Sequence, residues 1–373
     1  MSRIMAFIHD RLELAGHDVE YFCSDDVPES WNGWWGRRVS FPMAIRPKAI
    51  EANRNGRPYD IVNVHEPSAA PLLIGRRAHA AAVVITSHGL ERRAWDLAKE
   101  EGRFGRETPG LRTRLTYPPS ALWPSDLALR RADHILCLNE EDRQTLINHL
   151  HRAPGSVTRL YPGADQIYAL ASESRDYRRA SRVMFAGTWR KNKGIEDLVP
   201  AFVALADRHA DLTLHVIGAG VPPDVVWAKF PEGLRSRILC DTPADDFSMA
   251  AAFAAADLFL LPSLFEGTPL TLIQAMASGL PVVTTATCGM KDVIADQRNG
   301  LLVPIRSPHA LVTAIDTLLV NQSLRERLGR AARAEARGRY TWDRSAEPVL
   351  RAYETVMRAT GRTAHHVPAI ETT

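Results

Sequence analysis

The chain has 373 residues, of which 45% are hydrophobic and 24% are charged, and its formal net charge is +3. This length exceeds a typical single domain and suits two, while the small net charge excludes the strongly basic character of many nucleic-acid-binding proteins. The four cysteines lie far apart, without a CxxC pair or a histidine at zinc-ligand spacing, so we expect free thiols in a reducing compartment and no metal site.

No apolar run approaches the roughly 20 residues that a membrane-spanning helix needs. The first 17 residues contain acidic side chains and lack a small-residue cleavage site, which argues against a secretory signal. We therefore expect a cytoplasmic protein.

The first predicted element is an amphipathic helix with Ile4, Ile8 and Leu12 on one face. Gly16 is expected to end this helix, and residues 19–23 are predicted to form a strand. The chain therefore opens within a helix and strand pair rather than on a strand.

Short apolar strands alternate with helical patterns along the rest of the chain. Their hydrophobicity is continuous rather than alternating, which is typical of parallel strands that helices cover on both faces. The pattern predicts two doubly wound α/β domains, joined near residues 160–180, with ligands at the carboxyl ends of the strands in the cleft between the domains. The predicted strands are 60–65, 81–86, 134–138, 183–187, 212–218, 257–261 and 281–284.

The most specific pattern lies in the stretch from Leu261 to Thr285. A strand ends at Phe265-Glu266-Gly267, and a helix opens at Thr268-Pro269. A carboxylate at a strand end, a glycine and a helix N-terminus together form a site for a polar, anionic ligand.

A basic loop runs from Gly187 to Gly194 and contains Arg190, Lys191 and Lys193. It follows a predicted strand and precedes a predicted helix over 195–208. Cations beside a helix N-terminus neutralise phosphate well, because backbone N–H groups and the helix dipole add to the side-chain charge. A solvated basic turn is the alternative interpretation.

Two histidines follow neighbouring strands. His88 comes directly after the strand that ends at Thr86, and His65 has the same position one strand earlier. A histidine at such a strand end either donates a hydrogen bond or moves a proton in a cleft, or it caps a turn. His88, followed by a glycine, is the stronger candidate.

Taken together, these residues resemble the retaining glycosyltransferases of the GT-B fold, in the large family 4, or group 1, of sugar transferases. The resemblance runs nearly end to end and implies two Rossmann-like domains, a nucleotide-sugar donor held mostly by the C-terminal domain, and a metal-independent reaction that retains the anomeric configuration. No cofactor is implied. The supporting segments are 16–19, 59–65, 87–89, 132–135, 185–202, 256–263, 340–342 and Tyr353.

The family's functional residues carry over by position. Glu266 matches the first acidic residue of the Glu-x7-Glu motif and is expected to touch the donor sugar. Lys193 matches the phosphate-binding lysine, and His88 matches the histidine near donor sugar and acceptor. Fixed cations and N–H dipoles stabilise the charge that develops on the departing diphosphate, so no metal is expected. The other donor-binding candidates are Gly187, Thr188, Arg190, Gly267, Thr268, Pro269, Leu270 and Gln274.

Two residues in the donor-binding motifs depart from the family. Gln274 stands where the second glutamate binds the ribose, and its amide lacks the charge that strengthens such hydrogen bonds, so we expect weaker donor affinity. Thr188 replaces the arginine of the basic loop, and Arg190 or Lys191 is the candidate substitute.

The family's first strand and its glycine-rich loop have no counterpart in the sequence. Because the first strand of a doubly wound sheet is central, its absence would leave buried strand edges unpaired. Either the natural start lies upstream or the N-terminal domain is incomplete, and we expect the chain as written to be poorly stable and weakly active. The predicted boundaries are 1–165 for the N-terminal acceptor-side domain, 166–345 for the donor domain, 346–362 for a helix that crosses back, and 363–373 for a disordered tail.

The acceptor side is less specific. Residues 91–131 carry eight arginines among several aromatic residues, a combination that suits an anionic or lipid-linked acceptor at the inner membrane face. A solvated segment whose arginines pair with nearby glutamates is the alternative.

Two classes of function remain from the sequence. The first is a transferase that adds a sugar to a glycan, lipid-linked or small-molecule acceptor, in the synthesis of cell-surface polysaccharide or another glycoconjugate. The second is a non-catalytic nucleotide-sugar-binding relative or partner subunit. A Rossmann dehydrogenase is excluded, because no GxGxxG follows a strand with an acidic residue at the required distance.

Overall fold

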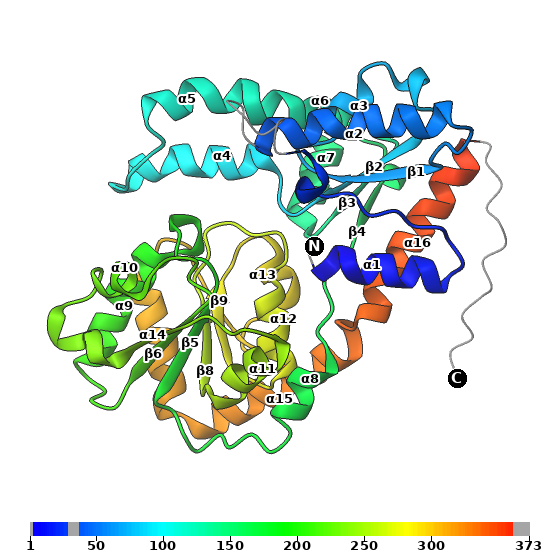
Figure 1. Ribbon diagram of the computed structural model, residues 1–373. Helices are drawn as coiled ribbons and strands as arrows, with labels where there is room; N and C mark the ends of the chain where they lie inside the picture. The colour runs from blue at the N-terminus through cyan, green and yellow to red at the C-terminus, as the bar shows by residue number, and fades with distance from the viewer. Residues whose placement is uncertain (1–2, 29–36, 361–373) are drawn as a thin grey trace. The chain divides into compact units, whose positions relative to one another are not determined.

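A computed structural model describes residues 3–28 and 37–360 of the protein. The chain forms two compact units, shown as ribbons in Figure 1. Unit 1 contains the chain up to Leu160 together with the part from Ser345 onward, and unit 2 runs from Tyr161 to Arg344. The predicted tail at 363–373 lies outside the described residues.

Unit 1 holds a four-stranded parallel sheet in the order β1-β2-β3-β4. Every residue of β2 and β3 is buried, as the continuous apolar pattern predicts. Helices α2, α3 and α6 lie together over one face of this sheet (Figure 1). The strands are β1 (Ile61–His65), β2 (Ala82–Ser87), β3 (His134–Cys137) and β4 (Val157–Arg159), and the helices named are α2 (Arg37–Arg54), α3 (Ala70–Leu73) and α6 (Trp123–Arg131).

The first and last helices of the described chain also belong to unit 1. The predicted N-terminal helix is present as α1 (Arg3–Leu14), and Gly16 follows it with a positive φ of 82°. The last helix, α16 (Trp342–Ala359), contacts the sheet through Tyr353, whose hydroxyl accepts a hydrogen bond from Asn63 of β1 at 2.6 Å. The C-terminal helix is therefore joined to the first strand of the sheet in unit 1.

The predicted strand at residues 19–23 is not formed. These residues are irregular, and β1 is the first strand among the described residues and lies at the edge of its sheet. A strand needs a neighbour for its backbone N–H and C=O groups, and within residues 3–28 and 37–360 no strand pairs with this segment. Its Glu20 instead binds Lys48 of α2 and Tyr59.

Unit 2 holds a six-stranded parallel sheet in the order β10-β9-β8-β5-β6-β7. Numbered from the first strand of this unit, that order is 3-2-1-4-5-6 read from the other edge, the doubly wound Rossmann arrangement. The direction of winding reverses between β5 and β8. The strands are β5 (Arg182–Ala186), β6 (Thr213–Ile217), β7 (Ile238–Asp241), β8 (Leu258–Leu261), β9 (Val282–Thr285) and β10 (Leu301–Val303).

Helices cover both faces of the sheet in unit 2. On one face α9 packs against α14, and on the other α12 packs against α15 and α8, and α11 against α8 (Figure 1). This sandwich buries the four inner strands, β5, β6, β8 and β9, almost completely and accounts for their mostly apolar sequences, whereas the edge strands β7 and β10 are partly exposed. The helices are α8 (Gln166–Ala171), α9 (Ile195–Ala206), α10 (Pro223–Trp227), α11 (Asp246–Ala255), α12 (Leu270–Ala277), α13 (Cys288–Val293), α14 (Pro308–Val320) and α15 (Gln322–Arg339).

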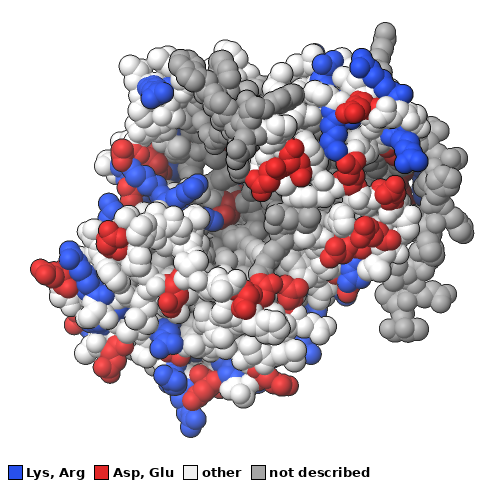
Figure 2. Space-filling model, viewed as in Figure 1, with Lys and Arg blue, Asp and Glu red and all other residues white. Residues whose placement is uncertain are grey.

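The distribution of charged side chains on the surface is consistent with the small net charge of the chain. On the face shown in Figure 2, acidic and basic side chains of the described residues are interspersed rather than separated by sign. Within residues 3–28 and 37–360, every helix is too short or too polar to cross a bilayer.

Candidate active site residues

The two principal candidates of unit 2 meet at the point where the sheet reverses its winding. Lys193 lies in the loop after β5 and Glu266 in the loop after β8, and β5 and β8 are hydrogen-bonded neighbours. The Lys193 ammonium donates a hydrogen bond to Glu266 Oε1, and Ser263 Oγ donates to the same oxygen at 2.9 Å. Ligands of doubly wound sheets bind at this reversal.

Gly194 allows the basic loop to press against the end of β8. It has a φ of 73°, and a Cβ atom there would lie 1.8 Å from the carbonyl oxygen of Pro262. The neighbouring carbonyl of Asn192 accepts a hydrogen bond from Leu264 N at 2.8 Å. This contact holds the lysine loop and the glutamate loop together, so only glycine fits at 194.

The remaining loop candidates lie around this ion pair. The N–H of Gly187 donates to the carbonyl of Ile217 at 2.9 Å, Thr188 is half-buried, and Arg190 is exposed. The N–H of Gly289 donates to the carbonyl of Gly267 at 2.8 Å, which fixes the loop that leads into α12. Helix α12 begins at Leu270, directly after Thr268 and Pro269. The role of its first N–H groups in binding an anionic donor stays a prediction.

Gln274 lies in the core of unit 2. Its side chain is only 3% exposed, and its amide donates a hydrogen bond of 2.7 Å to the hydroxyl of the buried Tyr168 on α8. A neutral amide with a partner tolerates burial better than a carboxylate does. Gln274 thus joins α12 to α8, and its role in binding the nucleotide stays a prediction.

In unit 1, the two candidate histidines contact each other. His65 ends β1, and His88 follows β2, its neighbour in the sheet. His88 Nε2 and His65 Nδ1 are 2.7 Å apart, and the rings are nearly parallel, at 6°. Burial, and secondly the neighbouring ring of His88, lowers the pKa of His65 to about 4, and burial also lowers the pKa of His88.

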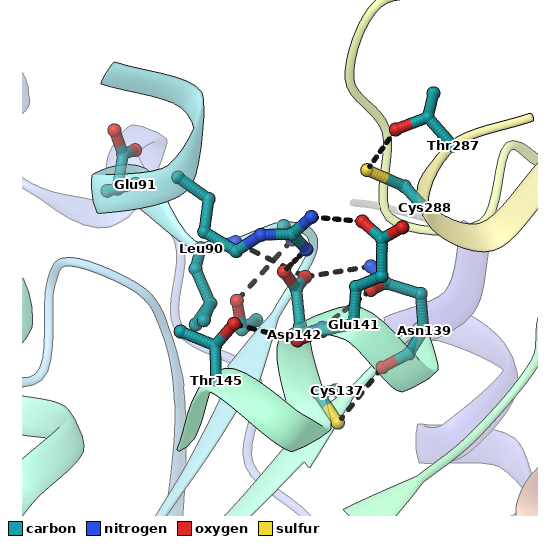
Figure 3. Close-up of polar contacts among 12 residues, drawn as sticks. Leu90, Glu91, Cys137, Asn139, Glu141, Asp142, Thr145, Thr287 and Cys288 are labelled. Atoms are coloured by element: carbon teal, nitrogen blue, oxygen red, sulfur yellow. Dashed lines mark hydrogen bonds and ion pairs between the residues drawn. The ribbon is translucent and has the colours of Figure 1, made fainter. Parts of the chain in front are cut away.

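A buried ion-pair network holds the turn that follows His88 (Figure 3). The fully buried Asp142 accepts a hydrogen bond from Leu90 N at 3.3 Å and another from the Asn139 amide at 2.8 Å. Arg93 of α4 (Glu91–Glu100) binds Asp142 and also Glu141. The network ties the His88 turn to α7 (Glu140–Asn148), whose N-cap residue is Asn139. This network was not predicted from the sequence.

Glu66 is a functional candidate that the sequence did not single out beyond its place beside His65. Its Oε1 accepts hydrogen bonds from Ser125 Oγ and, at 3.2 Å, from Glu91 N, while its Oε2 is buried without a hydrogen-bond partner among the described residues. Burial raises the pKa of Glu66 to about 7. Its carboxyl group therefore titrates near neutral pH.

An arginine-lined hollow of about 530 Å³ in unit 2 is separate from these residues. Arg175 in its wall donates to the carbonyls of Ser278 and Ala256, which precede β9 and β8. The hollow therefore lies at the amino ends of the strands, whereas Lys193 and Glu266 follow carboxyl ends. Its lining residues are Glu173, Ser174, Arg175, Tyr177, Arg330, Arg333, Ala334 and Arg337.

The arginines of residues 91–131 are partly paired. Arg92 binds Asp126, and Arg106 lies 3.5 Å from Glu101. In the same region, Leu111 and Leu115 of α5 (Leu111–Tyr117) are 74% and 68% exposed. The segment combines paired arginines with solvent-exposed apolar side chains.

The comparisons with known proteins agree with this topology. A family model described as "Glycosyl transferases group 1" matches residues 180–321, and one described as "Glycosyltransferase Family 4" matches residues 1–166. The chain belongs to the group 1, family 4 glycosyltransferases. The two matches fall largely on unit 2 and unit 1, respectively.

The individual proteins that match this chain have low sequence identity to it. The D-inositol 3-phosphate glycosyltransferase of Corynebacterium glutamicum is 31% identical over 239 residues, which are 60% of this chain and 57% of that protein. The chain thus spans little more than half the length of this relative. Sucrose-phosphate synthase from Thermosynechococcus elongatus superposes with a TM-score of 0.68 at 20% identity, over 92% of this chain and 82% of that one.

Anabaena Alr3699/HepE, solved in complex with UDP-glucose, superposes with a TM-score of 0.65 at 17% identity. The superposition covers 93% of this chain and 88% of that one. Together with the two parallel sheets, these structures show that the fold of this glycosyltransferase-family chain is GT-B.

Proposed function

We propose that this protein transfers a sugar from a nucleotide-sugar donor to an acceptor, with retention of anomeric configuration and without a metal ion or other cofactor. The observation that carries the proposal is the contact between Lys193 and Glu266 at the reversal of the sheet in unit 2, beside the N-terminus of α12. A cation, a carboxylate and helix N-terminal N–H groups at one place suit a sugar diphosphate.

Each group has a distinct task in this mechanism. As the bond between the sugar C1 and the diphosphate oxygen breaks, Lys193 and the N–H groups at the start of α12 stabilise the charge that grows on the leaving group. Glu266 accepts hydrogen bonds from sugar hydroxyls. The acceptor hydroxyl forms the new bond to C1 and passes its proton to the diphosphate oxygen that leaves, and His88 of unit 1 hydrogen-bonds to the reacting groups in the same reaction.

The donor and the acceptor define the rest of the proposal. HepE was solved in complex with UDP-glucose, so UDP-sugars are the first donors to test on this protein, followed by GDP- and ADP-sugars. The acceptor is a glycan, a lipid-linked sugar or a small molecule, and the product belongs to cell-surface polysaccharide or another glycoconjugate. We place the protein in the cytoplasm.

Donor binding and turnover are tested with the same panel. A ligand present at about a hundred times its dissociation constant stabilises the folded state by about 2.7 kcal/mol, which a thermal-shift assay detects. Lys193→Ala and Glu266→Ala are expected to abolish both the shift and sugar transfer, whereas the exposed Lys229→Ala is a matched control that changes neither. Binding without hydrolysis or transfer for any acceptor would favour the non-catalytic relative.

We further propose that α5 contacts the anionic inner face of the membrane. Leu111 and Leu115 are four residues apart and lie on one side of α5, and Arg112 beside them is exposed. Exposed leucines insert into the headgroup region while arginines attract anionic lipids.

Sedimentation with phosphatidylglycerol vesicles tests this contact. Leu111→Ser with Leu115→Ser should release the protein, and high salt should weaken its binding. Val320→Ser is the matched control, because Val320 of unit 2 is equally exposed, at 74%. Equal sedimentation of all variants would refute the contact.

A further inference from the structure

The rings of His65 and His88 lie edge to edge. Stacked rings keep their atoms about 3.5 Å apart or more. The 2.7 Å between His88 Nε2 and His65 Nδ1, combined with ring planes only 6° apart and centroids at 4.7 Å, therefore requires two rings in nearly one plane. This is the geometry of an N–H···N hydrogen bond between imidazoles.

One hydrogen bond between two imidazoles couples their tautomers. Each neutral ring carries one N–H. If His65 Nδ1 donates, the proton of His88 must sit on its outer nitrogen, Nδ1, which is then a donor. If His88 Nε2 donates, the outer Nδ1 of His88 is bare and accepts. The state of His65 therefore decides what His88 presents to a ligand.

We propose that His65 is the positioning residue of His88: it shares one proton with His88 Nε2, fixes the plane of that ring, and leaves His88 Nδ1 as the nitrogen that faces the substrate. The use of this nitrogen in sugar transfer rests on the proposed function, but the shared proton does not. The adjoining turn is held independently, through Leu90 N and Asp142.

The surroundings keep the pair neutral. Glu66, next to His65 in the chain, is engaged with Ser125 Oγ and Glu91 N, and Glu91 accepts a hydrogen bond from Tyr117. Among the described residues, His88 is the one titratable group that bears on the pKa of His65. The pKa of His88 is lowered by desolvation of its ring, although the residue is exposed overall. Two cationic imidazoles joined at 2.7 Å would lose the shared acceptor, so the bonded pair resists protonation of both rings.

Long-range proton–nitrogen NMR of the full chain with isotope-labelled histidine tests the proposal without turnover. His88→Gln assigns the His88 signals. In the unaltered protein we expect His88 as a single fixed tautomer that stays neutral as the pH falls below the ordinary histidine value of about 6.5. In His65→Phe, which removes the shared proton, His88 should show mixed tautomers.

Two further variants keep the test decisive. His65→Gln retains a side chain that can donate to His88 Nε2, so it should restore a fixed tautomer, including when His65→Phe fails to fold. His149→Phe, at an exposed position of unit 1, is the matched control and should leave the His88 signals unchanged. A single fixed His88 tautomer that persists in His65→Phe as in His65→Gln would overturn the proposal.

Transfer kinetics then relate the pair to the reaction. With His65→Phe, kcat should fall about ten- to a hundredfold while the donor KM stays within about twofold, because the donor is held by unit 2. His65→Gln should recover most of the loss. If the NMR changes occur but no donor supports transfer in any variant, the shared proton stands and the transferase function fails.

Discussion

The carboxyl group of Glu66 makes the stability of unit 1 depend on pH. Burial raises its pKa from the ordinary value of 4.5 to about 7, and the hydroxyls of Ser125 and Ser87 and the N–H of Glu91, which lower it, do not compensate. One of its oxygens has no hydrogen-bond partner among the described residues. The folded protein therefore holds a proton that the unfolded chain releases.

The direction and size of the effect on the free energy of unfolding follow from the difference between the folded and unfolded pKa of Glu66. Below about pH 4.5 both states are protonated and the group has no effect. As the pH rises through the window from 4.5 to about 7, the unfolded state gains relative stability. The shift of about 2.5 units corresponds to at most about 3 kcal/mol, reached above pH 7. Glu66→Gln keeps the shape without the charge and should remove this loss.

Hydrogen exchange of the β2 amides is the assay, because it reports unit 1 alone and the two units need not unfold together. At about pH 8 we expect Glu66→Gln to raise the opening free energy by about 2 to 3 kcal/mol, and at about pH 5 by less than about 1 kcal/mol. Glu51→Gln, exposed on α2, is the control with no change. A gain of equal size at both pH values would refute the reasoning.

Two other substitutions test local packing. Gly194→Ala should lower the melting temperature of unit 2 and abolish the donor-induced thermal shift, because the added Cβ meets the Pro262 carbonyl at 1.8 Å. Gly218→Ala is the control: Gly218 has a φ of 67° with open space around it, so this substitution should cost only about 1 to 2 kcal/mol. Equal losses for the two glycines would show that strain and not the clash decides. Asp142→Ala removes the buried acceptor of Leu90 N and of the Asn139 amide, together with one of the two carboxylates that bind Arg93, and should cost unit 1 about 3 to 5 kcal/mol in hydrogen exchange, against less than about 1 kcal/mol for Asp126→Ala in its more exposed pair.

The sequence predicted the parts of the fold that depend on local pattern. Continuous apolar runs identified β2, β3, β5 and β8, because strands covered on both faces must be apolar throughout. Strand order then follows from the rules of doubly wound sheets, which bring the loops after β5 and β8 together. The pairing of Lys193 with Glu266 was predictable in this way, although their direct ion pair was not.

The structural features that the sequence did not predict depend on contacts with residues that are distant in the chain. Residues 19–23 have a strand-like composition, but no strand of the described chain pairs with them, and Glu20 binds α2 instead. The contact of His65 with His88 needs the register of β1 against β2 as well as both side-chain rotamers. Glu66 gives no signal at all, since its pKa is a property of the packing around it.

The structure changes the interpretation of Gln274, the residue that departs from the family motif. From the sequence it is a glutamate that lost its charge, and the expected result is weaker binding of the ribose. In the structure its amide fills a buried position and bonds to Tyr168, where a carboxylate would carry a desolvation cost. The same substitution is therefore favourable for the packing of α12 on α8.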